Sequence, residues 1–395
     1  MRSRLSLLCL LPLLVIGCST VKVAPAPKPT ASGPAVRVDK ANAQDFPAGE
    51  SDGYRPPARL AVLLPMTGTS APAAAGVRDG FLAAYYAESR RRPVVKFYNT
   101  LGTGSGAQAA LAKAVEEGAQ MIVGPLTRDE VNAVYEQANT GMPLITLNRG
   151  SRLPPPRTSS FALLPDDEGT AVANRLVNRG LKSVLVFSNR SDNAQRAVAA
   201  FGETLRKRGG TLVAELTVSG SMSDLGPQLA ALSKGPTPPD AVFIALEAGP
   251  ARTVAAQLKA SVLAGLPRIA TSLILSGANA KSDVELTGIE YPEMPWLLDQ
   301  GGDLPDADAL AKKLPSARGP SQRLFAFGAD AWKLTAYFQR LYDQPSFSIP
   351  GNTGRLSIEI AGPVLRTPAW AVFSGGRGRP VRDGAPGTNA DKPAN

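Results

Sequence analysis

Four short stretches of the sequence contain residue types that could bind or transform a ligand. They are Cys18 after an apolar run, GTGSGA at residues 102–107, SDN at residues 191–193, and the carboxylates DDE at residues 166–168. The matching chemistries are a thiolate nucleophile, a phosphate-binding turn, part of a transpeptidase site and an acid–base pair. The 395 residues contain no histidine, which excludes His-activated nucleophiles, His-ligated zinc and a histidine general base.

The glycine-rich stretch matches G-x-G-x-x-[GA] between a predicted strand and a predicted helix. A dinucleotide site of this kind also needs an acidic residue at the end of the next strand. That strand ends in IVGPLT, which contains no acid. We therefore interpret residues 102–107 as a flexible turn.

The SDN stretch would mark a penicillin-binding transpeptidase only together with S-x-x-K and K-T-G. K-T-G does not occur, and S-x-x-K occurs only at Ser19 to Lys22, near the N-terminus. SDN follows the predicted strand KSVLVF, where Ser191 can cap the next helix. The carboxylates at 166–168 open another predicted helix and suit its dipole better than acid–base chemistry. The chain is therefore not expected to be an enzyme.

The N-terminus has the parts of a secretory signal peptide. Arg2 and Arg4 precede an apolar run over residues 5–16, and Gly17 precedes Cys18. The run is too short to span a bilayer comfortably. The pattern resembles a bacterial lipobox, so residues 1–17 are expected to be cleaved and Cys18 to be lipidated. The alternative is an ordinary signal peptide with an incidental cysteine.

Ser19, in place of aspartate after the cysteine, favours sorting to the outer membrane. Cys9 would leave with the signal, so no thiol would remain for a disulfide, a metal or catalysis.

The formal charge of +10 falls to +8 without Arg2 and Arg4. A basic chain can bind nucleic acid, but an exported lipoprotein encounters little nucleic acid outside the cytoplasm, so no nucleic-acid partner is expected. The basic runs at 90–92 and 206–208 are expected to close helices, with contact to anionic envelope polymers as the alternative.

Two segments cannot build a core. Residues 18–57 are rich in Pro, Ala and charged residues, and a flexible coil of that length spans about 35 Å on average. This segment is predicted to tether a folded body to the membrane. Residues 376–395 are predicted to form a disordered tail.

Short apolar strands and amphipathic helices alternate between these segments, as in RLAVLLP, AAAGVRDGFLAAYYAESR and VVKFYN. This alternation predicts an α/β fold with parallel sheets covered on both faces. The polar stretch SRLPPPRTSS divides the pattern into two arrays, which predicts two Rossmann-like lobes. Lobe 1 is assigned residues 58–160 plus about 275–343, and lobe 2 residues 161–274 plus about 344–375. A long late helix and a hairpin are expected to cross between the lobes.

This organisation resembles the type I periplasmic binding protein fold, of which the Leu/Ile/Val-binding protein is typical. Within it, GVRDGFLAAYY, VGPLTRDEV and TGRLSIEIAGPVLRTPAWAVF are most similar to the LpoA-type lipoproteins. The resemblance covers residues 58–375 and the lipobox. It implies a periplasm-facing activator of class A penicillin-binding proteins that needs no cofactor or metal. Long members of that family carry an N-terminal helical-repeat domain, whereas only the tether precedes Arg59 here.

The resemblance also locates a ligand cleft, at the turns that follow the first, third and fourth strands. The positions are Met66, Thr67, Thr69, Ser70, Leu126, Thr127 and Asn148. Amino-acid binders of this fold usually place a Ser/Thr pair after the strand that ends in Gly-Pro, where this chain has Leu126 and Thr127. We interpret the cleft as vestigial and do not expect a small-molecule ligand.

Two functional hypotheses remain. The first is a non-enzymatic outer-membrane lipoprotein that binds a class A penicillin-binding protein and activates it. The second is a solute-binding lipoprotein that delivers an amino acid or amide to an ABC importer. Sorting of the anchor to the outer membrane favours the first, because an importer works at the inner membrane.

Overall fold

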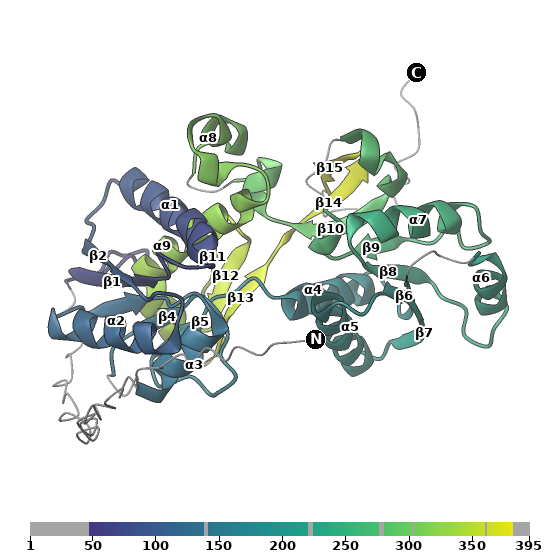
Figure 1. Ribbon diagram of the computed structural model, residues 1–395. Coiled ribbons are helices and arrows are strands. Elements are labelled where there is room, and N and C mark those ends of the chain that lie inside the picture. Colours follow the sequence, from purple (N-terminus) through teal and green to yellow (C-terminus); the bar gives the residue numbers. More distant parts are fainter. Residues whose placement is uncertain are drawn as a thin grey trace, which may run out of the picture. The chain divides into compact units, whose positions relative to one another are not determined.

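The computed structural model describes residues 47–137, 141–219, 224–275, 280–301, 304–359 and 362–381 (Figure 1). The expected signal peptide at 1–17, the lipid anchor at Cys18, most of the tether and residues 382–395 lie outside these ranges. Among the described residues, no helix is both long and apolar enough to cross a bilayer.

The first sheet consists of parallel strands in the order β2-β1-β3-β4-β5. Its strands are β1 (Arg59–Leu64), β2 (Val94–Asn99), β3 (Met121–Val123), β4 (Leu144–Thr146) and β5 (Thr158–Ser160). The helices between them are α1 (Ala71–Ala87), α2 (Gly104–Glu116) and α3 (Arg128–Gln137). Strands β3 and β4 are buried at every position, because helices cover both faces of a parallel sheet.

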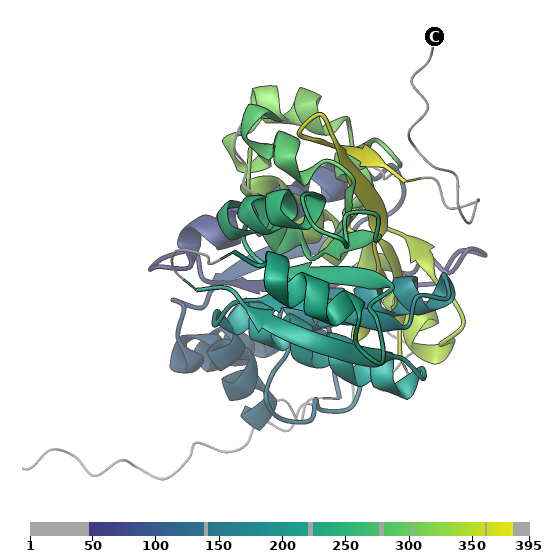
Figure 2. The same cartoon turned by 90° about the vertical axis from the view of Figure 1, so that its right-hand side faces the viewer.

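The second sheet has the order β15-β14-β10-β9-β8-β6-β7. Its strands are β6 (Ser183–Ser188), β7 (Thr211–Thr217), β8 (Ala241–Ala245), β9 (Arg268–Ala270), β10 (Ile289–Glu293), β14 (Ala369–Ser374) and β15 (Arg377–Pro380). The helices of this part are α4 (Pro165–Asn178), α5 (Asp192–Lys207), α6 (Gly226–Ser233) and α7 (Ala248–Lys259). Figure 2 shows this sheet with helices on both of its faces.

The late segments comprise turns inside the second lobe and elements that leave the second sheet after β10, pack on the first lobe and return at β14. The former are the 3-10 turns η2 (Ser272–Ile274) and η3 (Ala280–Leu286), which lead from β9 to β10. The latter are the 3-10 turns η4 (Pro295–Leu298) and η5 (Pro315–Ala317), the helices α8 (Ala307–Lys313) and α9 (Ser321–Asp343), and a small antiparallel sheet of β11 (Ile349–Pro350), β12 (Arg355–Ile358) and β13 (Val364–Thr367). Only Pro368 separates β13 from β14, so one extended segment leaves the small sheet and enters the second sheet (Figure 1). The predicted α/β fold with two lobes is confirmed, and so is the hairpin at β12 and β13. The first sheet is parallel as expected, whereas the second is mixed, because β14 and β15 add to its parallel strands in antiparallel pairing.

The assignment of the late segments to lobes differs from the sequence-based boundaries. Strand β10 pairs with β9 and β14, and Leu286 packs in the core of the second lobe, so residues 280–293 do not belong with the first sheet as expected. In the small sheet, Ile349, Leu356 and Val364 pack in the core of the first lobe, although residues 344–375 were assigned to lobe 2. Strand β15 occupies residues that were expected in the disordered tail. Each of these positions depends on pairing between distant segments, which local sequence patterns do not encode.

Helices α1 and α9 form the closest helix pair of the first lobe. Gly80 of α1 lies against the carbonyl oxygen of Phe325, and Gly328 of α9 lies against that of Val77. Phe81 packs edge-on against the ring of Trp332, with 5.9 Å between the ring centroids. The two glycines therefore allow the helix backbones to touch while aromatic rings fill the space beside them.

Residues 47–57 pack on the first lobe and are not part of a free tether. Tyr54 is 1% exposed, and its hydroxyl donates to the carbonyl oxygen of Arg91 at 2.8 Å. Its ring meets Tyr337 edge-on at 5.7 Å, and the Arg90 guanidinium carbon lies 3.7 Å from its centroid. The Pro-rich composition predicted an unfolded segment, but the tyrosine provides enough buried surface to anchor its last part.

We expect Tyr54→Ala to release this arm from the lobe. The backbone amide of Arg55 donates to the carbonyl oxygen of Ala336 at 2.7 Å, and its exchange with solvent should become at least about tenfold faster. Hydrogen exchange of the purified variant measures this effect. Tyr86→Ala is the matched control, because that ring is 69% exposed and its loss should leave the Arg55 amide protected. Unchanged protection in Tyr54→Ala would contradict the role given to this residue.

Candidate functional site

The turn after β1 carries the first group of predicted cleft residues. Met66, Thr67 and Thr69 are exposed, and Ser70 is half-buried at the start of α1. The Met66 amide donates to Oδ1 of Asn99 at 2.9 Å, and Thr67 Oγ1 accepts from Nδ2 of Asn99 at 3.1 Å. Asn99, at the end of β2, was not singled out in the sequence, yet it uses polar groups of this turn that a ligand would need.

In the turn after β3, the hydroxyl of Thr127 is hydrogen-bonded to a residue in the first turn of α3. Thr127 Oγ1 donates to Oε2 of Glu130 at 2.9 Å, and the Thr127 amide donates to the same oxygen at 2.9 Å. In return, the backbone amide of Glu130 donates to Oγ1 of Thr127 at 3.4 Å. This arrangement is a capping box. Glu130 is fully buried, and its other oxygen accepts from the hydroxyl of Thr100.

Asn148 joins the turns after β3 and β4. Its Nδ2 donates to the carbonyl oxygen of Leu126 at 3.0 Å, and its Oδ1 accepts from the Arg149 amide at 2.9 Å. The structure therefore brings the predicted residues of these turns to one edge of the first sheet. Several of their polar groups are bonded within the chain, which agrees with a vestigial cleft; the vestigial cleft stays a prediction.

We expect Thr127→Val to act as a loss of a helix cap rather than as a loss of a ligand. Removing the hydroxyl breaks its bonds with the Glu130 carboxylate and amide, while the backbone amide of residue 127 still donates to Glu130, and should lower the free energy of unfolding by about 1 kcal/mol. Urea unfolding measures the change. Thr69→Val is the control, because Thr69 is exposed and should tolerate the change within about 0.5 kcal/mol. Equal effects of the two substitutions would contradict this interpretation.

The carboxylates at 166–168 do not act on the helix dipole alone. Asp166 pairs with Arg196 at 2.5 Å and Asp167 with Arg149 at 3.2 Å. Burial raises the pKa of Asp167, although the nearby Arg149 opposes this shift. Glu168 accepts from the amide of Ser272 at 2.8 Å and from its hydroxyl at 2.6 Å.

A second set of buried charges surrounds Arg323 of α9. Its Nη1 lies 2.5 Å from Oε1 of Glu293 at the end of β10, and its Nη2 lies 3.7 Å from Oε1 of Glu168. Burial raises the pKa of Glu293, and Arg323 opposes this rise. The cluster ties α9, which packs on α1, to α4 and β10 of the other lobe. No local pattern in the sequence points to it, because its members come from three distant segments.

The remaining sequence motifs have structural roles. Ser191 caps α5 by accepting from the Ala194 amide at 3.3 Å, as predicted. The glycine-rich stretch is not a free turn, because α2 already begins at Gly104 and Thr103 caps it. A Cβ atom at Gly106 would lie 2.1 Å from the carbonyl oxygen of Thr100, so this glycine allows the helix to approach the strand end.

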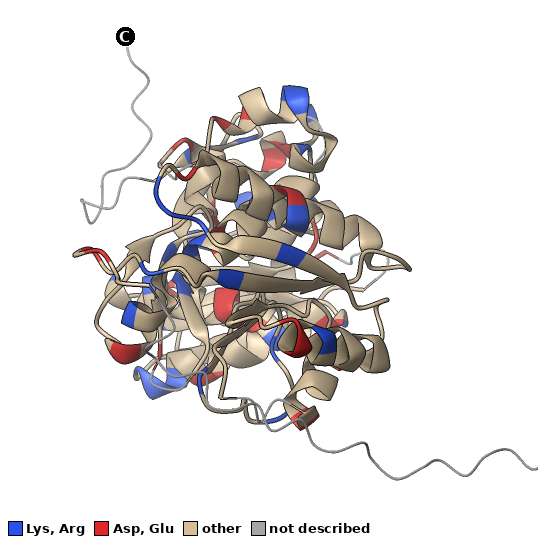
Figure 3. Ribbon diagram, turned by 90° about the vertical axis from the view of Figure 1, so that its left-hand side faces the viewer, with Lys and Arg blue, Asp and Glu red and all other residues tan. Residues whose placement is uncertain are grey.

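The basic runs differ in their placement. Arg206 and Lys207 lie in the last turn of α5, as expected, whereas α1 ends at Ala87, before Arg90. Arg90 instead pairs with Glu88 at 2.9 Å and with a carboxylate of the N-terminal arm. Blue and red residues are interspersed on the side shown in Figure 3, so the basic excess is not one block there. Among the described residues, no group of three His, Cys, Asp or Glu side chains is placed to hold a metal ion.

Comparison with known families identifies the chain. The family described as "LppC putative lipoprotein" matches residues 53–220 and 216–376. The chain belongs to this lipoprotein family. The match covers both lobes, including the small sheet and β14, so it extends over most of the folded chain.

Several curated relatives of this LppC family chain are named "Penicillin-binding protein activator LpoA". The protein from Photobacterium profundum is 26% identical over 345 residues, which are 80% of this chain and 56% of the relative. The protein from Mannheimia succiniciproducens is 28% identical over 342 residues, or 80% and 54%. The chain thus spans about half the length of the curated relatives it matches.

Solved structures support the fold. The LpoA C-domain from Haemophilus influenzae, described as a regulator of PBP1A, has a TM-score of 0.70 at 23% identity; the match covers 82% of this chain and all of that one. A "putative branched-chain amino acid ABC transporter" from Chromobacterium violaceum has a TM-score of 0.66 at 24% identity, covering 80% and 99%. The predicted type I periplasmic binding protein fold is confirmed.

Proposed function

We propose that this LppC family member is a non-enzymatic outer-membrane lipoprotein that binds a class A penicillin-binding protein and raises its activity. The observation that carries the proposal is the extended similarity, over 80% of the chain, to proteins named as penicillin-binding protein activators. The absence of histidine from the sequence also favours a regulator over a hydrolase.

The contacts at the predicted cleft support a protein-binding role over solute transport. Thr127, whose hydroxyl would hold an amino-acid ligand, is bonded to Glu130, and Asn148 is bonded to Leu126. A ligand would have to replace these bonds with its own, and an exchange of hydrogen bonds yields little net free energy. The lobes then serve as a rigid scaffold for the surface that touches the synthase.

An activator needs only a modest preference for the active form of its partner. A tenfold increase in activity corresponds to a difference in binding free energy of at most about 1.4 kcal/mol. A transient interface can supply such a difference. The proposal therefore does not require a catalytic group on this chain.

The membrane anchor gives a separate prediction. Cys18→Ala should prevent lipidation and leave the protein as a soluble or uncleaved form, because the apolar run ending in IGCS no longer ends in an acceptor. Fractionation of cells that express each form measures the distribution. The wild-type protein should sediment with outer membranes, and its recovery free in the periplasm would contradict the anchor.

Reconstitution tests the proposed activity. A purified class A penicillin-binding protein should polymerise or cross-link lipid-linked precursor faster when the unlipidated chain from Ser19 onward is added. A mutant synthase with an inactive catalytic site, mixed with the same chain, controls for activity of the chain itself. Absence of both binding and a rate change would contradict the proposal.

The solute-binding function remains the second candidate. The fold similarity to the Chromobacterium violaceum protein named as an amino-acid transporter favours it. Calorimetric titration with free amino acids and amides separates the two. Tight binding that Thr127→Val weakens, together with no effect on a synthase, would favour the transport function.

A further inference from the structure

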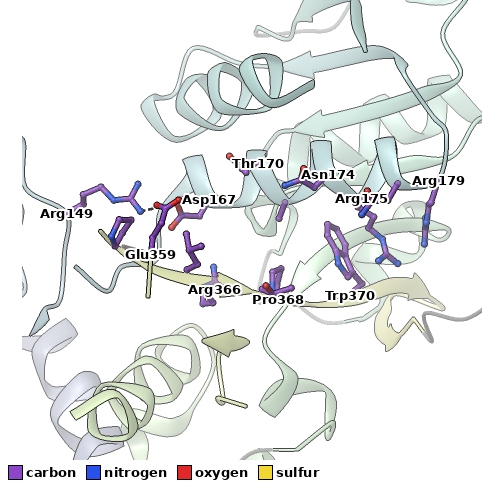
Figure 4. A pocket seen from close by; sticks show the side chains of 15 residues that line it. Arg149, Asp167, Thr170, Asn174, Arg175, Arg179, Glu359, Arg366, Pro368 and Trp370 are labelled. Carbon is purple, nitrogen blue, oxygen red and sulfur yellow. Dashed lines mark hydrogen bonds and ion pairs between the residues drawn. The ribbon is translucent and has the colours of Figure 1, made fainter. Parts of the chain in front are cut away.

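A pocket of about 620 Å³ lies along α4, opposite the crossing strands β13 and β14 (Figure 4). Side chains of α4 form one wall, and Leu365, Pro368 and Trp370 belong to the other. Its volume falls in the range of small-molecule sites. None of the predicted cleft residues lines it, so it is a separate site in the chain.

The polar lining consists mostly of hydrogen-bond donors. Asn174 and Asn178 each accept a bond at 2.9 Å from the Arg208 guanidinium through Oδ1. Because a guanidinium only donates, these bonds fix the orientation of both amides. What each asparagine has left for the pocket is therefore its NH₂ group, which is a donor.

Charged residues add to this excess of donors. The pocket is lined by Arg149, Arg175, Arg179 and Arg366, against the carboxylates Asp167 and Glu359. Glu290, which is not among the lining residues, pairs with Arg175 and Arg179 at 2.8 Å each, and Asp167 pairs with Arg149.

Arg366 differs from the other three arginines. Its Nη1 donates to the carbonyl oxygen of Thr353 at 3.1 Å, and its buried Nε has no hydrogen-bond partner among the described residues. No carboxylate oxygen of the described residues lies within 4 Å of its guanidinium nitrogens. Burial lowers the pKa of the Arg366 guanidinium, and Glu168, Asp167 and Asp330 oppose this shift from a longer distance. Its buried Nε still lacks a hydrogen-bond partner, which is unfavourable, so an anion that accepts from this guanidinium would stabilise it.

The apolar side of the pocket favours an anion that carries a hydrocarbon group over an inorganic ion. The Arg175 guanidinium carbon lies 4.3 Å from the centroid of the Trp370 ring, so one face of this ring is covered. Leu365 is 45% exposed and lines the same space, where an apolar group could cover it. Burial of that surface would add to the affinity of an anion that carries a small hydrocarbon body.

We propose that this pocket binds a small organic anion, a phosphate or carboxylate joined to a compact apolar group. Arg366 and the amide NH₂ groups of Asn174 and Asn178 contact the anion, and Leu365 covers the apolar part. The site is independent of the proposed contact with a synthase, so either can fail without the other.

Isothermal titration calorimetry with butyl phosphate tests the proposal on the chain from Ser19 onward. Butyl phosphate should bind, inorganic phosphate should bind more weakly, and the neutral probe 1-butanol should not bind. Equal binding of butanol and butyl phosphate would overturn the proposal. Binding to phosphatidylglycerol vesicles without binding of butyl phosphate would also overturn it, because a lipid surface would then be the ligand.

Variants assign the binding to this pocket. Arg366→Met should weaken butyl phosphate binding at least about tenfold, whereas Arg366→Lys should retain part of it. Asn174→Asp keeps the acceptor for Arg208 but places a negative charge in the pocket, so it should abolish binding without loss of the fold. Arg206→Met, an exposed arginine outside the pocket, is the control. Unchanged affinity in Asn174→Asp would overturn the proposal even if Arg366→Met failed to fold.

Discussion

Gly80→Ala is expected to destabilise the first lobe by about 3 kcal/mol or more. A Cβ atom built at this position would lie 1.8 Å from the carbonyl oxygen of Phe325 and 2.9 Å from its Cα. The contact is with helix backbone, so no side-chain rotation can relieve it. The helices α1 and α9 would have to move apart, which opens gaps around Phe81 and Trp332.

The same argument applies from the other helix. A Cβ atom at Gly328 would lie 1.9 Å from the carbonyl oxygen of Val77. Gly80→Ala and Gly328→Ala disturb one contact, so their effects should not add in the double variant. Urea unfolding of the two single variants and the double variant measures this coupling.

Gly249→Ala provides the matched control for these changes. Gly249 lies in the first turn of α7, and a Cβ atom there would meet nothing within 4 Å. Alanine should leave stability within about 0.5 kcal/mol or raise it slightly, because it restricts the unfolded chain. A similar loss of stability in Gly249→Ala and Gly80→Ala would show that helix packing is not the cause.

The sequence predicted the fold where the information is local. Strand β1 is a short apolar run, and α5 has a serine cap and basic residues in its last turn. Strand β10 has the mixed sequence IEYPE, and its place in the second sheet depends on β9 and β14. The hydrophobic periodicity of a segment does not show which strands 20 to 80 residues away pair with it. For this reason the predicted lobe boundaries after Ile274 were wrong.

The same limit applies to the candidate cleft. The turn positions were predictable because the carboxyl ends of parallel strands meet at one edge. Their partners Asn99 and Arg149 were not singled out, since no motif joins them to the turns. One signal was present: Thr127 and Glu130 have the T-x-x-E spacing of a capping box, which could have predicted that the hydroxyl is used internally.

Arg323→Met is expected to lower the free energy of unfolding by about 3–5 kcal/mol at pH 8. Arg323 lies 2.5 Å from Glu293 and 3.7 Å from Glu168, and the Glu293 side chain is 7% exposed. Removal of the cation leaves buried negative charge without compensation, which costs more than the ion pair itself contributes. Because the cluster joins α9 to α4 and β10, both lobes should lose stability together.

The size of the effect should depend on pH. Burial already raises the pKa of Glu293 above its ordinary value of 4.5, and Arg323 opposes that rise. Without Arg323 the pKa of Glu293 rises further, so the folded state binds this proton more tightly than the unfolded state does. A carboxyl group of this kind stabilises the fold below the unfolded pKa and loses that contribution as the pH rises through the folded pKa. The difference between wild type and Arg323→Met should therefore be larger at pH 8 than at pH 5.

Urea unfolding of both proteins at pH 5 and pH 8 measures this dependence. The double variant Arg323→Met/Glu293→Gln should be more stable at pH 8 than Arg323→Met alone, because a neutral amide replaces the uncompensated carboxylate. Lys207→Met is the control, since Lys207 and Glu203 form an exposed pair on α5 whose loss should cost less than about 1 kcal/mol. If Arg323→Met lost the same stability at both pH values, the loss would come from side-chain packing and not from charge. The double variant would then be no more stable than the single one.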